Sequence, residues 1–407
     1  MLSCWSRDLQ SSSHHSPTVE QRTDLAWFVM VDPAQGEFTH AYLTAKGLLD
    51  GSFNPQEHRD LLGFPLVAGE HIPPSAGVLE GLAVQHTLQH MPATRRRSVD
   101  PHLRLSQAVE DWATLHAFEA KDGLCASLPA KWERLGDLIL FPATLLDQQP
   151  WREAGQHDHA TDLWRAMAGA LKVQSLGVQA PIADDIVRSS QVKMLLGESN
   201  VVMLDHGITY VFDAAKVMFS SGNITERRRI GTMDMTGETV IDAYAGIGYY
   251  TLPMLVHGGA AHVHACELNP PSIEALLEGA MANEVNGRLT VHPGDNALSL
   301  QRLKGIADRC HLGLLPSSEA VWEACLLALK PSGGMLHIHM NVEEERIGQW
   351  VDNTVARFEA LALAHGLVRS FEAVHLERVK WYAPFVRHVV LDLAVRPTEV
   401  TAPIQRP

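Results

Sequence analysis

The order of apolar and polar positions changes character at Thr239. From there on, short apolar runs of strand length alternate with longer segments in which apolar residues recur every three or four positions. Such alternation predicts a parallel, doubly wound α/β sheet, because each helix crosses over to bring the next strand in parallel. The predicted strands lie in "TVIDAYAG", "HVHACELN", "LTVHPGDN", "HLGLLP" and "MLHIHMNV".

The last two apolar segments depart from this alternation. Residues 370–382 and 387–395 are predicted strands with only a short turn between them, which leaves no room for a crossover helix. We expect them to pair antiparallel, so that the sheet contains one reversed strand.

The chain before Thr239 shows no such repeat and predicts smaller α+β domains. A strand in "LAWFVMVDP" and a helix in "THAYLTAKGLLDGSF" come first, and "QVKMLLG", "NVVMLDHG" and "ITYVFDA" are expected to form a meander of strands. Leu163, Met167 and Leu171 have helical spacing. The predicted divisions are a disordered tail at 1–23, a small α/β unit at 24–87, a basic linker at 88–105, a middle α+β domain at 106–215, the doubly wound domain at 216–396 and a tail at 397–407.

The charge of the chain limits the ways in which it can bind nucleic acid. Its 407 residues include 33 basic and 47 acidic side chains, for a net charge of -14. A nucleic-acid ligand would therefore need local basic patches on an acidic body. The candidates are Arg95, Arg96 and Arg97, Lys131 and Arg134, and Arg378 with Lys380.

Cysteine usage and hydropathy point to a reducing compartment. The five cysteines form no C-x-x-C pair, so neither a disulfide framework nor a zinc site is indicated. No apolar run is long enough for a membrane span, and the N-terminal segment lacks the apolar stretch of a secretory signal. We expect a cytoplasmic protein without a membrane partner.

The clearest chemical motif is "DAYAGIGYYT". Asp242 ends a predicted strand, and Gly246 and Gly248 let the backbone of the following turn approach a ligand closely. A dinucleotide site would favour a third glycine where this chain has Thr251. The acid before the loop suits a cationic cofactor better, and S-adenosylmethionine is the obvious one.

Acids also end the next two predicted strands. Glu267 can accept hydrogen bonds from both ribose hydroxyls, and Asp295 with Asn296 can bond the edge of an adenine. Taken alone, the pair in "GDN" would be an Asx turn. Ligands bind such sheets at the carboxyl ends of parallel strands, where all three acids lie.

A polar segment, "KVMFSSGNITERRR", precedes the glycine motif. Ser220 is polar and lies among turn residues, and Arg227 could clamp a carboxylate through two hydrogen bonds. The alternative is that residues 227–229 are a solvated basic face, which composition alone favours.

Taken together, these segments resemble one family. "NITERRR", "VIDAYAGIGYYTLPMLVHGGAAHVHACELNP", "GDN", "LGLLPSSE" and "LHIHMNV" look like the aminocarboxypropyl transferases of wybutosine synthesis in tRNA, whose broader relatives are the tRNA guanine-37 N1-methyltransferases. The resemblance is strong over about residues 190–345, and the first hundred residues match poorly.

The resemblance implies a class I methyltransferase (Rossmann-like) fold and a specific reaction. The family transfers the 3-amino-3-carboxypropyl arm of S-adenosylmethionine to a ring carbon of 4-demethylwyosine at position 37 of phenylalanine tRNA, leaving 5'-methylthioadenosine. The resemblance places cofactor contacts on Ser220, Arg227, Glu267, Asp295 and Asn296, which join Asp242 and Gly246 of the glycine motif as predicted cofactor residues. Relatives commonly carry Lys at the position of Arg227, which puts the exact carboxylate contact in question.

No catalytic residue can be identified from the sequence. An apolar wall at Pro316, with Ser317 and Ser318, is expected to hold a flat tricyclic base, and the serines either bond the base or cap the next helix. His337 and His339 share one face of a strand, but no third ligand is apparent. A structural role is therefore favoured, and no metal is expected.

Three other functions remain open. A tRNA guanine-37 N1-methyltransferase would need a base at N1 and is expected to carry Asn-Leu-Pro where this chain has Leu314-Leu315-Pro316. A non-catalytic tRNA-binding module would not need the intact acids, and a nicotinamide dehydrogenase is disfavoured by Thr251. A monomer is expected, although the sequence does not fix the oligomeric state.

Overall fold

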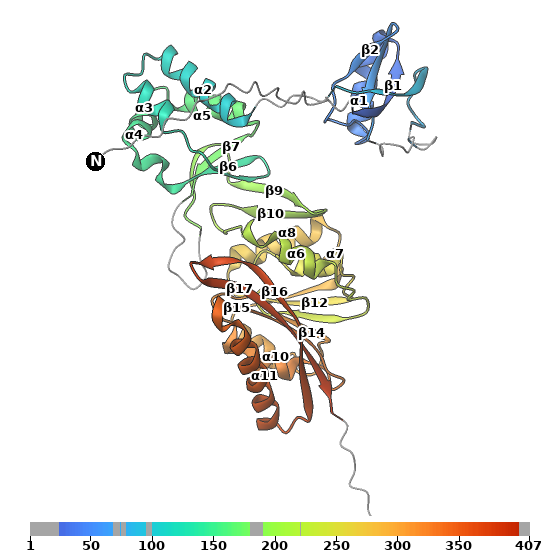
Figure 1. The fold of residues 1–407 in the computed structure, drawn as a ribbon, viewed down its shortest axis with the longest axis vertical. Helices are drawn as coiled ribbons and strands as arrows, with labels where there is room; N and C mark the ends of the chain where they lie inside the picture. The colour runs from blue at the N-terminus through green and yellow to red at the C-terminus, as the bar shows by residue number, and fades with distance from the viewer. Residues whose placement is uncertain are drawn as a thin grey trace, which may run out of the picture. The chain divides into compact units, whose positions relative to one another are not determined.

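The computed structural model describes residues 24–67, 74, 79–94, 100–179, 190–219 and 221–398, and it divides into two compact units between Asp100 and Pro101 (Figure 1). The two units are described separately. This boundary falls inside the predicted basic linker, of which residues 95–99 lie outside the described residues.

The N-terminal unit is a small sheet with one α-helix. Its strands run in the order β2-β3-β1-β4, and Phe28, Val29 and Leu43 are fully buried in its core. The linker prediction was wrong at both ends, because residues 88–92 belong to β4 and a helix already begins at Pro101. The elements are β1 Leu25–Val31, α1 Gly36–Ala45, β2 Gln56–His58, β3 Leu61–Pro65 and β4 His86–Pro92.

The second unit opens with helices around a four-stranded sheet in the order β5-β6-β7-β8. Leu163, Met167 and Leu171 lie buried on one side of α5, as their spacing predicts. The elements are α2 Pro101–Leu115, α3 Lys121–Ala126, β5 Glu133–Leu135, β6 Leu138–Phe141, α4 Gln149–Gln156, α5 Ala160–Leu171, β7 Ser175–Val178 and β8 Lys193–Leu196.

The predicted meander of three strands was wrong. Strand β8 joins β7, whereas β9 (Asn200–Asp205) and β10 (Ile208–Asp213) pair only with each other. Asn283, at the end of α8, donates to the carbonyl of Thr209 at 2.7 Å and accepts from its N–H at 2.9 Å, which fixes the hairpin to the large domain. Long-range packing thus overrode sequence proximity.

The doubly wound sheet has seven strands in the order β13-β12-β11-β14-β15-β17-β16. Strands β11 to β15 are parallel, and β17 is reversed between β15 and β16, so the predicted class I methyltransferase fold with a terminal antiparallel hairpin is confirmed (Figure 1). The strands are β11 Thr239–Asp242, β12 His262–Glu267, β13 Leu289–Pro293, β14 Arg309–Leu312, β15 Gly334–Glu343, β16 Arg369–Ala383 and β17 Val386–Pro397. The helices are α6 Ile224–Gly231, α7 Thr251–Val256, α8 Pro270–Ala282, α9 Asn296–Gln301, α10 Trp322–Ala328 and α11 Ile347–Ala364.

The two faces of this sheet differ in chemistry. Leu312, Leu336, Ile338 and Leu391 belong to an apolar core shared with α9, α10 and α11. The alternate positions form a polar row that follows the register of the strands, since Asp242 lies opposite His311, His311 opposite His337, and His337 opposite Asp392. Members of this row are at most 4% exposed, although all can carry charge.

Candidate active site

The glycine turn between β11 and α7 is shaped by backbone geometry and by one side-chain bond. Gly246 and Gly248 have φ of +55° and +93°, and a Cβ at Gly246 would lie 2.8 Å from the ring of Tyr249. Thr251, which stands where a dinucleotide fold favours glycine, donates from Oγ1 to Oδ2 of Asp242 at 2.8 Å. Asp242 is fully buried, and its bond with Thr251 connects the end of β11 to the start of α7.

Glu267 lies directly beside this turn. Its carboxylate accepts hydrogen bonds from the N–H groups of Gly246 at 2.7 Å, Leu268 at 3.0 Å and Asn269 at 2.8 Å. Burial raises the pKa of Glu267, and the N–H donors oppose that shift. The acid is thus pre-oriented at the carboxyl end of its strand.

The third strand end reaches the same turn. Asp295 caps α9 by accepting from the N–H of Ala297 at 2.8 Å, as in an Asx turn. Asn296 donates to the carbonyl of Ala243 at 2.9 Å and so links the end of β13 to the glycine turn. Asp295 remains exposed. The predicted cofactor residues Asp242, Gly246, Glu267, Asp295 and Asn296 are therefore brought together.

The other two predicted cofactor residues fared differently. Ser220 lies outside the described residues. Arg227 is 3% exposed and is not part of a solvated face, because its Nε and one terminal nitrogen bond Oδ2 of Asp205 at 3.1 and 2.7 Å. Its guanidinium also lies 5.1 Å from the ring centroid of Phe219.

The two following arginines separate in the same way. Arg228 is exposed, whereas Arg229 bonds both Glu226 and Asp392, with shortest distances of 2.8 and 2.6 Å. Burial raises the pKa of Glu226, which is fully buried, and the bonds from Arg229 oppose this rise. Arg229 therefore ties α6 to β17 across the polar face.

Both serines after Pro316 are bonded within the protein. Ser317 Oγ accepts from the N–H of Glu319 at 3.1 Å, and Ser318 Oγ accepts from the indole N–H of Trp322 at 3.1 Å. Ser318 is fully buried, whereas Pro316 is exposed. The Ser317 hydroxyl thus stabilises the turn into the following 3-10 helix, and the Ser318 hydroxyl is explained by its bond to Trp322. The carbonyl of Pro316 accepts a hydrogen bond from the N–H of Asn341 at 3.0 Å. This bond places Pro316 and the two serines beside the end of β15.

The histidines of the polar face form two connected groups. His337 Nδ1 lies 2.6 Å from Asp392, and its Nε2 lies 2.7 Å from Arg309. His339 lies between two other histidines, with Nε2 at 3.1 Å from His311 Nε2 and Nδ1 at 3.0 Å from His388 Nε2. Burial lowers the pKa of His337 and of His388 to about 4, so both rings are neutral at pH 7.

Several buried polar atoms around these histidines have no hydrogen-bond partner among the described residues. They are His311 Nδ1, both carboxamide atoms of Asn341, and His388 Nδ1. Buried polar atoms in native proteins are nearly always bonded, so this cluster is a candidate position for a ligand or an ordered water molecule. The sequence did not lead us to predict Asn341 or His388. For Asn341, the polar residues at every second position of "LHIHMNV" could have indicated a polar face of the strand.

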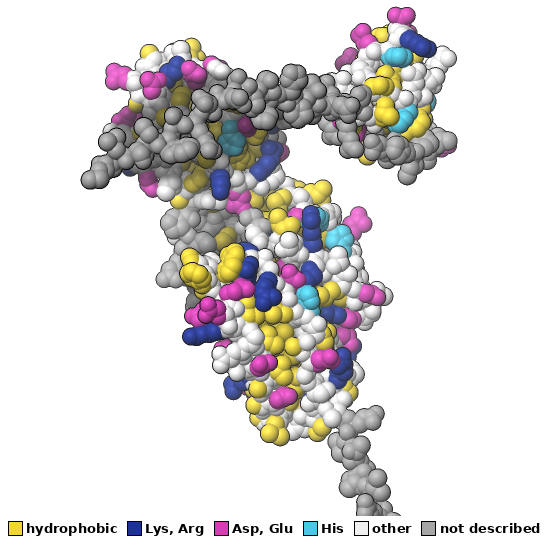
Figure 2. All heavy atoms as spheres, viewed as in Figure 1, with side chains coloured by type: hydrophobic (Ala, Val, Ile, Leu, Met, Phe, Trp, Pro, Cys, Tyr) yellow, Lys and Arg dark blue, Asp and Glu magenta, His cyan; other side chains and the backbone are white. Residues whose placement is uncertain are grey.

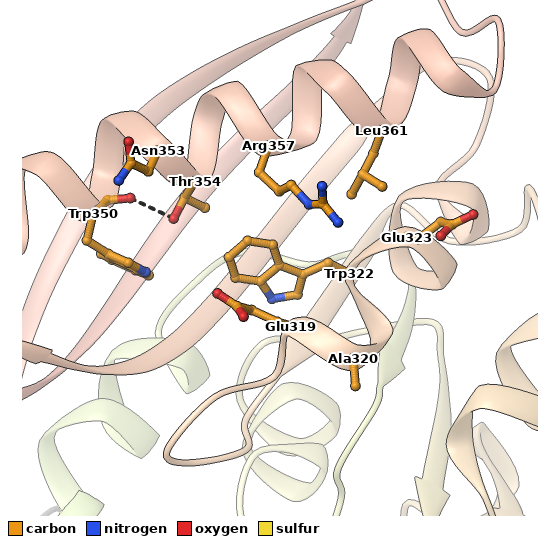
Figure 3. A pocket seen from close by; sticks show the side chains of 9 residues that line it. All are labelled: Glu319, Ala320, Trp322, Glu323, Trp350, Asn353, Thr354, Arg357 and Leu361. Atoms are coloured by element: carbon orange, nitrogen blue, oxygen red, sulfur yellow. Dashed lines mark hydrogen bonds between the residues drawn. The ribbon is translucent and has the colours of Figure 1, made fainter.

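Two other features lie away from the strand ends. A cavity of about 590 Å³ lies between α10 and α11, on the apolar side of the sheet, where Trp322, Trp350 and Arg357 line it (Figure 3). On the middle domain, ligand atoms of His116, His159 and Asp162 come within 4.8 Å of one another, and two of these side chains are exposed. The expected absence of a metal remains a prediction.

The predicted basic patches are weaker than the sequence suggested. Arg134 bonds the carbonyls of Gly136, Leu171 and Lys172, and Arg378 pairs with Glu344 at 3.4 Å. On the face drawn in Figure 2, Lys and Arg are interspersed with Asp and Glu. Lys131 is exposed, Lys380 is half-buried, and Arg95 to Arg97 lie outside the described residues. No helix in the described ranges is long and apolar enough to cross a membrane.

Comparison with known proteins agrees with this geometry. Residues 201–367 match the model of the TRM5/TYW2 methyltransferase domain. The chain is 36% identical to a tRNA wybutosine-synthesizing protein 2 homolog of Danio rerio, over 92% of this chain and 100% of that protein. It is 43% identical to tRNA wybutosine-synthesizing protein 2/3/4 of Oryza sativa over 68% of this chain, and it spans only 26% of that longer protein.

A solved structure extends the likeness to three dimensions. P. horikoshii TYW2 in complex with MeSAdo superposes with a TM-score of 0.57 at 28% identity, over 72% of this chain and 100% of that one. The sequence similarity and the sheet with its acidic strand ends point to the same family. The chain belongs to the tRNA wybutosine-synthesizing protein 2 family, within the TRM5/TYW2 methyltransferase-domain proteins.

Proposed function

We propose that the protein transfers the 3-amino-3-carboxypropyl group of S-adenosylmethionine to a ring carbon of 4-demethylwyosine at position 37 of phenylalanine tRNA. The observation that carries the proposal is the similarity to wybutosine-synthesizing protein 2, including a structure solved with MeSAdo. Methylthioadenosine is what remains of S-adenosylmethionine when the aminocarboxypropyl arm has left. A methyltransferase would instead leave S-adenosylhomocysteine, with the arm still attached to sulfur.

The donor set at the strand ends fits this cofactor. Glu267 is held by backbone N–H groups at the glycine turn, and Asp295 and Asn296 face the same turn from the next strand. We assign the ribose to Glu267 and the adenine edge to Asp295 and Asn296, with Asp242 and Gly246 shaping the turn. When bound, the cofactor supplies an electrophilic carbon attached to a sulfonium.

Ser220 and Arg227 remain proposed contacts of the amino-acid arm. The hydrogen bonds that Arg227 donates to Asp205 fix the direction of its guanidinium, which supports a positioned clamp more than a flexible one. A clamp of this kind selects which carbon of the sulfonium faces the acceptor. The exposed Pro316 lies beside the end of β15, and we propose that it forms part of the wall for the flat base.

Separate labels in the two parts of the cofactor test the proposal. The protein is incubated with phenylalanine tRNA carrying 4-demethylwyosine and with S-adenosylmethionine labelled in the methyl or in the carboxyl carbon. We expect the carboxyl label in tRNA and the methyl label in methylthioadenosine. Methyl label in tRNA would establish the methyltransferase alternative, and label in neither product would establish a binding module.

Arg227 offers a matched series within the same assay. Arg227→Ala should lower arm transfer more than cofactor binding, because orientation lowers the barrier beyond affinity. Arg227→Lys should recover much of the rate, since relatives carry Lys there. Arg228→Ala is the control, because Arg228 is the exposed neighbour. Equal, small effects of Arg227→Ala and Arg228→Ala would eliminate the clamp.

The finer assignments of partner and place are part of the same proposal. We propose a monomeric, cytoplasmic enzyme without a membrane partner, whose macromolecular substrate is tRNA. Sedimentation of the protein alone and with one equivalent of tRNA tests the stoichiometry, and a dimer would contradict it.

A further inference from the structure

The proposed reaction releases a proton, and the residues assigned to the cofactor include no first acceptor for it. The acceptor carbon forms a bond to the γ-carbon of the arm, while the carbon–sulfur bond breaks and leaves its electron pair on sulfur. The C–H bond of the acceptor carbon must then return its electron pair to the ring. A group near the acceptor has to take the proton.

The polar face contains an ordered route for such a proton. His388 Nε2, His339 Nδ1, His339 Nε2 and His311 Nε2 lie in sequence, separated by 3.0 and 3.1 Å. His311 Nδ1 lies 3.7 Å from Oδ1 of Asp242. Tyr250 covers the route, with its ring centroid 4.1 Å from that of His311 and 5.2 Å from that of His339.

The nearest carboxylate, Asp242 at 3.7 Å from His311 Nδ1, gives this route a direction by its charge. The carboxylate of Asp242 favours the tautomer of His311 that carries its proton on Nδ1, which leaves Nε2 as an acceptor. His339 then donates from Nε2 and accepts at Nδ1, and His388 donates from Nε2. The remaining acceptor is Nδ1 of His388, which is buried and has no hydrogen-bond partner in the part of the chain that the structure describes.

The position of His388 suits a group that meets the acceptor base. It lies opposite Asn341 on β15, whose carboxamide is also unpaired and whose N–H bonds the carbonyl of Pro316. Lys380 on β16 lies on its other side in the register. Burial, followed by the charge of Lys380, lowers the pKa of His388 to about 4, so the ring is neutral before the reaction and passes a proton on rather than retaining it.

We infer that His388 accepts the proton released from the acceptor carbon and passes it through His339 and His311 to Asp242. This inference rests on the proposed function. The relay also keeps the charge of the site constant, because the proton reaches Asp242 beside the glycine turn as the positive charge of the sulfonium is lost. The proton leaves to solvent when the products dissociate.

The test compares acceptors with protium or deuterium on the reacting ring carbon. Wild-type enzyme should show little isotope effect, because the relay keeps proton loss fast. His388→Gln keeps a bond to His339 but cannot carry the proton, so transfer should slow by about a hundredfold and a primary isotope effect should appear. Cofactor affinity should not change.

His337→Asn is the matched control, because His337 is equally buried but bonds Asp392 and Arg309 outside the relay. It should show no isotope effect at any residual rate. If His388→Gln does not fold, His311→Gln should show the same isotope effect. A His388→Gln enzyme with the wild-type rate would overturn the relay alone, whereas a wild-type protein that transfers no arm would overturn the proposed function.

The turn between β16 and β17 carries an independent second inference. Trp381, Tyr382 and Phe385 are 54%, 57% and 82% exposed, and the guanidinium of Arg387 lies 3.6 Å from the Trp381 ring centroid. This turn adjoins the carboxyl end of β15, since Val386 pairs with Glu343. We infer that these aromatic side chains stack unpaired bases of the RNA loop whose nucleotide enters the site. This also rests on a tRNA substrate.

Binding of an isolated anticodon stem-loop tests the stacking surface. Trp381→Ala and Phe385→Ala should each weaken binding about tenfold, equally at low and high salt, because stacking releases no counterions. Leu363→Ala is the control, at an 81% exposed residue near the end of α11. Wild-type affinity in Phe385→Ala would overturn the inference, while a wild-type protein that binds no stem-loop would overturn the tRNA substrate itself.

Discussion

The two faces of β14, β15 and β17 consist of alternating residues from the same segments, yet they follow different rules. On one face, Leu312, Ile338 and Leu391 pack into an apolar core. On the other, His311, His339 and Asp392 are equally buried but lie within polar networks. The apolar face needs only shape and volume. On the polar face each buried charge needs its partner, because a buried charge left unpaired is costly.

The largest expected effect comes from breaking the polar face at Arg229. Arg229→Ala leaves the carboxylates of Glu226 and Asp392 buried without their cation, which should cost about 3–5 kcal/mol of the free energy of unfolding. Urea denaturation measures the loss. Arg228→Ala, at the exposed neighbour, should change stability by less than about 0.5 kcal/mol, and a similar loss in both variants would contradict the comparison.

A truncation on the apolar face should cost somewhat less and should depend on volume alone. Leu336→Ala removes a fully buried side chain and should lower the free energy of unfolding by about 2–5 kcal/mol. Leu336→Met, which nearly conserves volume, should cost less than about 1.5 kcal/mol. If Leu336→Met were as destabilising as Leu336→Ala, the apolar face would not be governed by packing.

A substitution at the strand end should affect binding rather than stability. Glu267→Ala should weaken S-adenosylmethionine binding by about 1.5–3 kcal/mol, because hydrogen bonds to a charged group are lost. Calorimetric titration measures the affinity, and the melting temperature without cofactor is the control. Unchanged affinity would remove Glu267 from the ribose site.

The smallest expected effect is the change in the free energy of unfolding per pH unit, which should differ between the two faces. The lowered pKa of His337 means that the unfolded chain binds a proton more readily than the folded one. The contribution of His337 to the free energy of unfolding is therefore fully present above about pH 6.5. It falls by about 1.4 kcal/mol per pH unit as the pH drops towards 4. The raised pKa of Glu226 acts in the opposite direction.

Unfolding midpoints in urea between pH 7.5 and 4.5 measure this slope. His337→Asn should reduce the slope, whereas Leu336→Ala should lower stability by the same amount at every pH, because it removes no titratable group. An unchanged slope in His337→Asn would mean that the imidazole is not held neutral.

The sequence by itself determined the features that depend on local periodicity. The alternation after Thr239 predicted the parallel sheet and its reversed strand, and strand-end acids predicted Asp242, Glu267 and Asp295 at one edge. These predictions succeeded because the carboxyl ends of parallel strands meet wherever the strands form.

Only the tertiary structure decided which polar residues meet across the sheet. Arg229 and Asp392 lie 163 positions apart, and His339 and His388 lie 49 apart, so no local pattern records their contact. The register of β15 and β17 brings His339 near His388, whereas the placement of α6 on the polar face brings Arg229 to Asp392. For the same reason, the sequence left Arg227 between a clamp and a solvated face, and only its burial against Asp205 excluded the solvated face.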